Sequence, residues 1–274
     1  ELKGRYPNIL EDAEKGETAR ELFGEAQTML KKIIDEKWLT AKAVVGMAPA
    51  NATADDDIVV YETDDRDVEV GRFHMLRKQV KQPAGKANES LADYVAPVDS
   101  GKADYVGMFA CTTGLGIDAK LEEFRAAHDD HSAIMLQAIA DRLAEACAEW
   151  LHEMVRKEEW GYMPDEQLSN EDRIKEQYVG IRPALGYPAC PDHTEKDLLW
   201  KLLEAEEKTG IWLTESKAMV PTAAVSGLYF SHPDSRYFDV GKVTQEQVEE
   251  YAARKDMEKE TVEKWLAPNL GYDV

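Results

Sequence analysis

The segment of residues 180–191, GIRPALGYPACP, combines the residue types that a small-molecule site needs. Its three prolines and two glycines restrict the backbone and allow a ligand to approach it closely. Arg182 offers a forked set of N–H donors that suits a carboxylate. The pattern therefore predicts a rigid loop that binds a small molecule. The alternative is a structural crossover loop in which Arg182 pairs with a neighbouring acid.

A charged stripe is expected along the helix that the sequence predicts over residues 132–157. Asp141, Glu145 and His152 are spaced so that steps of four and seven residues return to nearly the same helical face. Such a stripe can hold the amine of a ligand or orient an imidazole ring. The alternative is a charged face that only meets solvent.

Two short histidine motifs are better explained as helix starts than as metal sites. Residues 128–131 read HDDH, and neighbours in sequence cannot all reach one ion, whereas acids before a helix can cap its free N–H groups. Residues 193–196 read HTEK, where Thr194 as an N-cap competes with a role in a site. The aromatic residues of segment 229–238, YFSHPDSRYF, can stack on a flat ligand such as a nucleoside or belong to the core.

Composition excludes several classes of protein. The 274 residues include 33 Lys and Arg against 54 Asp and Glu, a formal net charge of −21, which argues against nucleic-acid binding because phosphate contacts need a basic face. No apolar run approaches the ~18 residues that span a bilayer, and no charged segment followed by an apolar one, as in a leader, is found in the sequence. The three scattered cysteines form no zinc motif and suit a reducing, cytoplasmic compartment. Because it begins with Glu1, the chain is expected to be a processed or excised piece.

The elements that must position these residues follow from hydrophobic periodicity. Helices are predicted over 16–36, 132–157, 171–177, 195–208, 245–255 and 259–266, and strands over 42–48, 57–62, 104–112, 211–215, 223–230 and 237–240. The first two strands read as a hairpin, with Pro49 and Asn51 in its turn. The helix over 132–157 is expected to bury a face that includes Ile134 and Trp150, and Thr244 with Gln247 is expected to form a capping box. Without a βαβ rhythm, the order favours an α+β fold with an antiparallel sheet.

Longer motifs resemble one family over nearly the whole chain. They are GKADYVG (101–107), HDD (128–130), DRLAEA (141–146), GIRPALGYPACPDHTEK (180–196), LTES (213–216), VSGLYFSHPDS (225–235) and WLAPNLGYD (265–273). Their order and length resemble the C-terminal activation domain of cobalamin-dependent methionine synthase. The resemblance implies a single α+β domain over residues 1–274, with a twisted antiparallel sheet and surrounding helices.

The resemblance also implies a function in methionine biosynthesis. The family domain binds S-adenosyl-L-methionine and presents its methyl group to the cobalt of cobalamin, which a partner cobalamin-binding domain holds. A flavodoxin or flavoprotein reductase returns the electron that cobalt has lost. The activity implied is that of a methyltransferase that is not catalytic alone.

Motif matching assigns roles to individual residues. Arg182 corresponds to the arginine that holds the ligand's carboxylate, and the other residues implied at the ligand are Ala184, Gly186, Tyr187, Glu145, Tyr237 and Phe238. Tyr187 is also expected to face the corrin, and Asp141 to hold the histidine displaced from cobalt. The family's further acidic ligand, just upstream of GRYP (4–7), is expected to be missing. An acid that the family carries near Gly116 and Ile117 is apolar here, and Leu185 stands where proline or alanine is common.

Two other functions compete with this one. A docking protein would only cap the cobalamin domain or recruit the reductase, and its ligand site would be vestigial. An independent S-adenosylmethionine-dependent methyltransferase is disfavoured, because the sequence lacks a glycine-rich turn between a strand and a helix. It also lacks a Ser/His/Asp order, a GxSxG motif and a Walker loop, so it predicts no self-sufficient catalyst.

Overall fold

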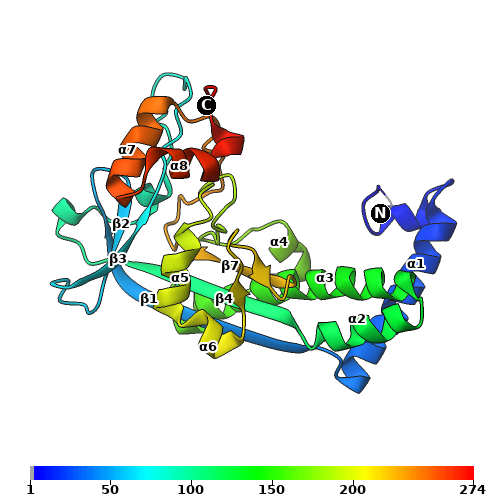
Figure 1. Ribbon diagram of the computed structural model, residues 1–274. Coiled ribbons are helices and arrows are strands. Elements are labelled where there is room, and N and C mark those ends of the chain that lie inside the picture. Colours follow the sequence, from blue (N-terminus) through cyan, green and yellow to red (C-terminus); the bar gives the residue numbers. More distant parts are fainter. Residues whose placement is uncertain (1–2) are drawn as a thin grey trace.

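A five-stranded antiparallel sheet, in the order β3-β2-β1-β4-β7, forms the centre of the computed structural model, which describes residues 3–274 (Figure 1). Its strands are β1 (Thr40–Ala52), β2 (Asp57–Tyr61), β3 (Glu69–His74), β4 (Tyr105–Leu115) and β7 (Ala224–Tyr229). The short strands β5 (Trp212–Leu213) and β6 (Met219–Val220) pair separately. This architecture confirms the predicted α+β class with an antiparallel sheet.

Eight α-helices surround the sheet in the described part of the chain. They are α1 (Gly16–Glu36), α2 (Ile117–Ala126), α3 (Asp130–Met154), α4 (Asn170–Ile174), α5 (Glu195–Leu203), α6 (Ala205–Thr209), α7 (Gln245–Lys255) and α8 (Lys259–Trp265). Helix α3 continues into one π-helical turn, Val155–Glu159. Helices α1, α2 and α3 gather at one end of the molecule, and α7 and α8 at the other (Figure 1).

The two faces of β4 carry different helices, because side chains alternate along a strand. Phe109 and Cys111 pack in one buried cluster with Leu151 of α3. Met108 points the other way and packs in a second cluster with Leu199 of α5. Strand β7, next to β4, is the last strand of the sheet. Helix α3 therefore packs on one face of this end of the sheet and α5 on the other.

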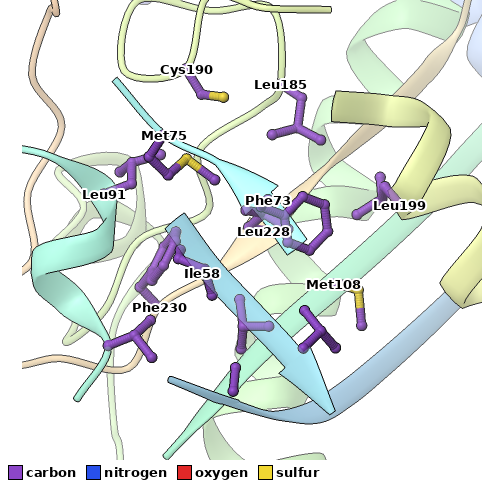
Figure 2. Close-up of a cluster of buried hydrophobic side chains, with 14 of the residues drawn as sticks. Ile58, Phe73, Met75, Leu91, Met108, Leu185, Cys190, Leu199, Leu228 and Phe230 are labelled. Atoms are coloured by element: carbon purple, nitrogen blue, oxygen red, sulfur yellow. The ribbon is translucent and has the colours of Figure 1, made fainter. Parts of the chain in front are cut away.

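The loop of residues 180–191 is held in the core by its own apolar side chains. Leu185 and Cys190 are buried in the same cluster as Phe73 of β3, Leu199 of α5 and Leu228 of β7 (Figure 2). Burial of a leucine side chain contributes roughly 2 kcal/mol. The loop has no regular secondary structure, as predicted, yet hydrophobic burial fixes its position.

Strand β1 runs further than predicted. Pro49 and Asn51 do not form a turn, because β1 pairs with β4 up to Pro49 and then with β2 from Ala50 to Ala52. Pro49 has no N–H to donate, and it lies where the partner strand changes. The predicted hairpin therefore exists, but its turn lies at residues 53–56.

Several other predictions need correction. The helix predicted over 195–208 breaks at Glu204, whose backbone is left-handed. Residues 237–240 form no strand, and β3, β6 and α2 were not predicted from the sequence. Ile134 and Trp150 of α3 are not buried but 61% and 57% exposed. Ile134 lies near the start of α3 and Trp150 near its end, on different faces of the helix, so the two positions are exposed separately.

Helix starts follow the capping rules in part. Asp129 accepts from the backbone N–H of Ser132, which confirms the capping role of the HDDH motif. Thr244 accepts from the N–H of Gln247, but the Gln247 amide donates to the carbonyl of Arg77, so no reciprocal box forms. Thr194 makes no side-chain cap, since its hydroxyl donates to Asp192.

Within residues 3–274, no helix has the length and apolar character that crossing a membrane requires.

Candidate functional site

A cavity of about 560 Å³ lies beside β7, the last strand of the sheet. The 180–191 loop forms one wall, β7 the floor, and α3, α5 and the segment 237–239 the remaining sides. Its lining residues are Glu145, Arg182, Pro183, Ala184, Leu185, Tyr187, Pro188, Ala189, Lys196, Met219, Ala224, Val225, Ser226, Tyr237, Phe238 and Asp239. A mainly apolar cavity of this size with a few polar groups is typical of a small-molecule site.

The first half of the loop extends the sheet. Ile181 and Phe230 exchange two backbone hydrogen bonds of 3.0 Å, and the Leu228 N–H donates to the Pro183 carbonyl at 3.0 Å. Gly227 makes this approach possible, because a Cβ there would lie 2.4 Å from the Pro183 oxygen. Residues 181–183 therefore lie along β7 as a short, irregular edge.

A tight turn forms the second half of the loop. Gly186 has φ +90°, its N–H donates to the Cys190 carbonyl at 2.8 Å, and the His193 ring occupies the space beside its Cα. Tyr187, next in sequence, is 63% exposed at the rim of the cavity. The turn thus presents an aromatic face to whatever approaches the cavity from outside.

Three side chains hold the guanidinium group of Arg182. One nitrogen, Nη1, donates to the Tyr178 hydroxyl at 2.6 Å and contacts His152 Nδ1 at 3.3 Å. The other, Nη2, donates to Glu149 Oε2 at 2.7 Å. Burial alone would lower the pKa of Arg182, but the neighbouring Tyr178 and Glu149 raise it above its ordinary value. Arg182 is therefore a fixed cation, with its side chain only 15% exposed.

Two of the five guanidinium N–H groups remain available. The three bonds above use both hydrogens of Nη1 and one of Nη2, and no partner for Nε lies within residues 3–274. The pairing with Glu149 agrees with the alternative prediction, a structural crossover loop in which Arg182 pairs with a neighbouring acid. The remaining donors leave room for a ligand carboxylate, which can accept from two guanidinium N–H groups at once.

Further polar groups face the cavity from other elements. The Tyr237 hydroxyl accepts from the backbone N–H of Arg182 at 3.1 Å, which ties the 237–239 segment to the loop. Ser226 of β7 is buried, and its hydroxyl has no hydrogen-bond partner among the described residues. The Lys196 ammonium contacts His193 Nδ1 at 3.1 Å and donates to the Lys217 carbonyl at 3.0 Å, and burial lowers its pKa.

Comparison with known proteins agrees with this geometry. A family model described as the activation domain of vitamin B12 dependent methionine synthase matches residues 1–256. The chain belongs to this family. A crystal structure described as the MetH reactivation domain bound to AdoHcy is 56% identical in sequence and superimposes with a TM-score of 0.96. The match covers 99% of this chain and 83% of that chain.

The activation domain brings together most of the residues that motif matching singled out. Those that line the cavity are Arg182, Ala184, Tyr187, Glu145, Tyr237 and Phe238. Gly186 lies within the loop but does not line the cavity, and Asp141 is exposed on α3 one turn before Glu145. The roles assigned to these residues stay predictions.

The predicted charged stripe on α3 is divided by burial. Asp141 and Glu145 are exposed, whereas His152 is fully buried behind Arg182. Sequence reasoning missed Glu149 and Tyr178, which hold Arg182, and also Lys196 and Ser226 in the cavity wall. Glu149 follows Glu145 by one helical turn, so its spacing was a usable signal.

The described residues contain no group of three or more His, Cys, Asp or Glu side chains that could hold a metal ion. His193 packs against Gly186 and contacts Lys196, so it supports the loop. Burial and the Lys196 charge lower the pKa of His193. A neutral His193 can accept from Lys196 through Nδ1.

Proposed function

We propose that this activation domain, over residues 1–274, binds S-adenosylmethionine in the cavity beside β7 and presents the methyl group to the cobalt of cobalamin. The observation that carries the proposal is the restrained guanidinium of Arg182, a residue that lines the cavity and keeps two N–H groups without a partner among the described residues. The relative of known structure supports the ligand class, since its description names AdoHcy, the demethylated form of S-adenosylmethionine.

The cavity fits the parts of such a ligand. Arg182 would hold the carboxylate, and the exposed carboxylate of Glu145, one helical turn before Glu149 on α3, would hold the amino group or balance the sulfonium charge. Pro183, Ala184 and Phe238 would cover the nucleoside.

The residues at the rim fit contact with a corrin. Tyr187 is an exposed aromatic side chain on a turn that two backbone hydrogen bonds close, from the Gly186 N–H to the Cys190 carbonyl and from the Cys190 N–H to the Tyr187 carbonyl. It can therefore pack against a flat macrocycle. Asp141, exposed on α3, would hold the histidine that leaves the cobalt. Cobalamin, carried by a partner domain and reduced by a flavodoxin or flavoprotein reductase, supplies the cobalt that accepts the methyl group. The contribution of this chain is to bind and orient the methyl donor.

The first test is calorimetric titration of the chain with S-adenosylmethionine and with S-adenosylhomocysteine. Arg182→Ala is expected to lower both affinities by roughly a hundredfold, because a charge-assisted carboxylate contact is lost. Arg182→Lys keeps the charge but not the forked pair of donors, so its affinities are expected to lie between those of the intact chain and those of Arg182→Ala. Arg125→Ala, an exposed arginine on α2, is the matched control and is expected to change nothing.

The outcomes separate the two candidate functions. Binding that is lost in Arg182→Ala supports the proposal. Absence of binding by the intact chain would favour the docking protein with a vestigial site. Unchanged binding in Arg182→Ala would show that the ligand lies elsewhere.

A further inference from the structure

We infer that His152 is a positioning residue for Arg182: its neutral imidazole accepts one N–H of the guanidinium and so directs the remaining N–H groups at the carboxylate of the ligand. The inference rests on the proposed binding of S-adenosylmethionine and adds a residue that does not line the cavity.

The His152 ring is fixed on both sides. It is 0% exposed and stacks on the Tyr229 ring of β7, with 4.9 Å between centroids and 21° between planes. The Tyr178 ring lies nearly perpendicular to it, with 5.1 Å between ring centroids and 79° between planes. A ring held this way cannot turn, so its Nδ1 stays 3.3 Å from Arg182 Nη1.

The hydrogen-bond pattern requires one tautomer. Arg182 can only donate, so His152 Nδ1 must accept, and the ring proton then lies on Nε2. Nε2 faces the Tyr162 hydroxyl at 3.4 Å, and that hydroxyl donates to the Val179 carbonyl at 3.3 Å. The chain from Arg182 to Val179 therefore has a donor and an acceptor at each step.

The imidazole stays neutral in this environment. Burial is the main cause that lowers the pKa of His152, to about 2, and the positive charges of Arg156 and Arg182 lower it further. A neutral acceptor orients the guanidinium without cancelling its charge. A second carboxylate in this place would compete with the ligand for Arg182, since Glu149 already pairs with Nη2.

The test compares two ligands that differ in the carboxylate. S-adenosylhomocysteine carries it, whereas 5′-methylthioadenosine has the same nucleoside and sulfur but no amino-acid group. His152→Gln places its amide near the Nε2 position and loses the acceptor at Nδ1, while His152→Asn keeps an oxygen near Nδ1. By calorimetry, His152→Gln is expected to lose about tenfold in affinity for S-adenosylhomocysteine and less than about twofold for 5′-methylthioadenosine.

The conservative variant and two further variants complete the test. His152→Asn is expected to stay within about threefold of the intact chain for both ligands. Tyr178→Phe removes the other acceptor of Nη1 and keeps the ring, so it is expected to show the same ligand-selective loss. His131→Asn changes an exposed histidine at the start of α3 and is the matched control, expected to leave both affinities unchanged.

Either of two results would overturn the inference: equal affinities of the Gln and Asn variants for S-adenosylhomocysteine, or equal losses for both ligands. Failure of the proposed function looks different. In that case the intact chain itself binds no S-adenosylhomocysteine, or Arg182→Ala binds it unchanged. If the His152 variants unfold, seen as a collapse of the thermal transition, nitrogen NMR of the intact chain decides instead: the inference requires the His152 proton on Nε2, and a proton on Nδ1 would overturn it.

Discussion

Single glycines set the shape of the cavity. At Gly227 the missing side chain lets the loop carbonyl of Pro183 reach β7, and at Gly186 it makes room for the His193 ring. Gly186 also has φ +90°, a conformation that other residues adopt only with strain. The loop geometry that presents Arg182 and Tyr187 therefore requires that these two positions carry no side chain.

Gly186→Ala tests this dependence. A Cβ at this position would lie 2.2 Å from His193 ring atoms, so the ring or the turn must move. The expected cost is about 1 kcal/mol for the backbone conformation and a further ~1–3 kcal/mol for the clash. Urea unfolding measures it, and calorimetry is expected to show weaker binding of S-adenosylhomocysteine.

Gly241→Ala is the matched control for this substitution. Its φ is +75°, but no atom lies within 4 Å of the added Cβ. It is expected to show only the backbone cost and unchanged ligand affinity. Equal effects of the two substitutions would contradict a role for the His193 contact.

At the scale of elements, helix α7 is tied to the end of the 180–191 loop by a buried ionic cluster. The Lys255 ammonium lies 2.6 Å from Asp192 and 2.5 Å from Glu195, and the Tyr251 hydroxyl donates to Asp192 at 2.9 Å. Burial alone would lower the pKa of Lys255, but the charges of Glu195 and Asp192 raise it. The cluster joins α7 to the start of α5, directly after the loop.

Lys255→Met is expected to lower the free energy of unfolding by about 3–5 kcal/mol, because it leaves two buried carboxylates without their cation. The Lys255 side chain is only 7% exposed, so solvent cannot replace the pairing. Lys259→Met, a lysine of α8 paired with Glu249 at the surface, is expected to cost ~0–1 kcal/mol. Urea unfolding of both variants makes the comparison, and a similar small effect would show that the cluster is not needed for stability.

In the whole molecule, the cavity beside β7 lies between two ends that have separate cores. One core lies among α1, α2 and α3, and the other among α7, α8 and the segments beside them. The sheet joins them, and both faces of β4 and β7 are covered by helices at the cavity. With a net charge of −21, the ion pairs that hold buried acids matter to the stability of the whole.

The chain is expected to lose stability as the pH falls below about 4. Burial would raise the pKa of Asp57 and Asp192, but His74 and Arg254 around Asp57 and Lys255 beside Asp192 hold both below the ordinary 3.8. A lowered carboxyl pKa gives stability that is present above 3.8 and is lost as the pH falls through the folded-state value. Glu195 acts in the opposite direction, because its burial raises its pKa.

Urea midpoints measured between pH 7 and pH 3 test this expectation. They should change little above pH 4.5 and fall below pH 4, by the linkage argument. Asp57→Asn should be less stable at pH 7 and lose less stability between pH 7 and pH 3. A midpoint that keeps rising down to pH 3 would contradict the assignment.

Much of the fold was determined by the sequence because its signals are local. The stripe of apolar residues over 16–36 predicted α1 closely, since a helix repeats its contacts every three to four residues. Thr244 as a cap, paired with Gln247, likewise predicted where α7 begins. The prolines and glycines of 180–191 predicted an irregular loop for the same local reason. Long ordered motifs identified the family, and with it six of the residues that line the cavity.

Only the tertiary structure decided how Arg182 is held. Its partners His152 and Glu149 lie 30 and 33 residues away in sequence, and no local spacing specifies that α3 packs them behind the loop. Strand β3 likewise lacks an apolar alternation and exists because β2 pairs with it. Burial separates His152 from Asp141 and Glu145, although helical spacing alone groups the three together. Periodicity determines which face of a helix a residue occupies, whereas packing determines what that face meets.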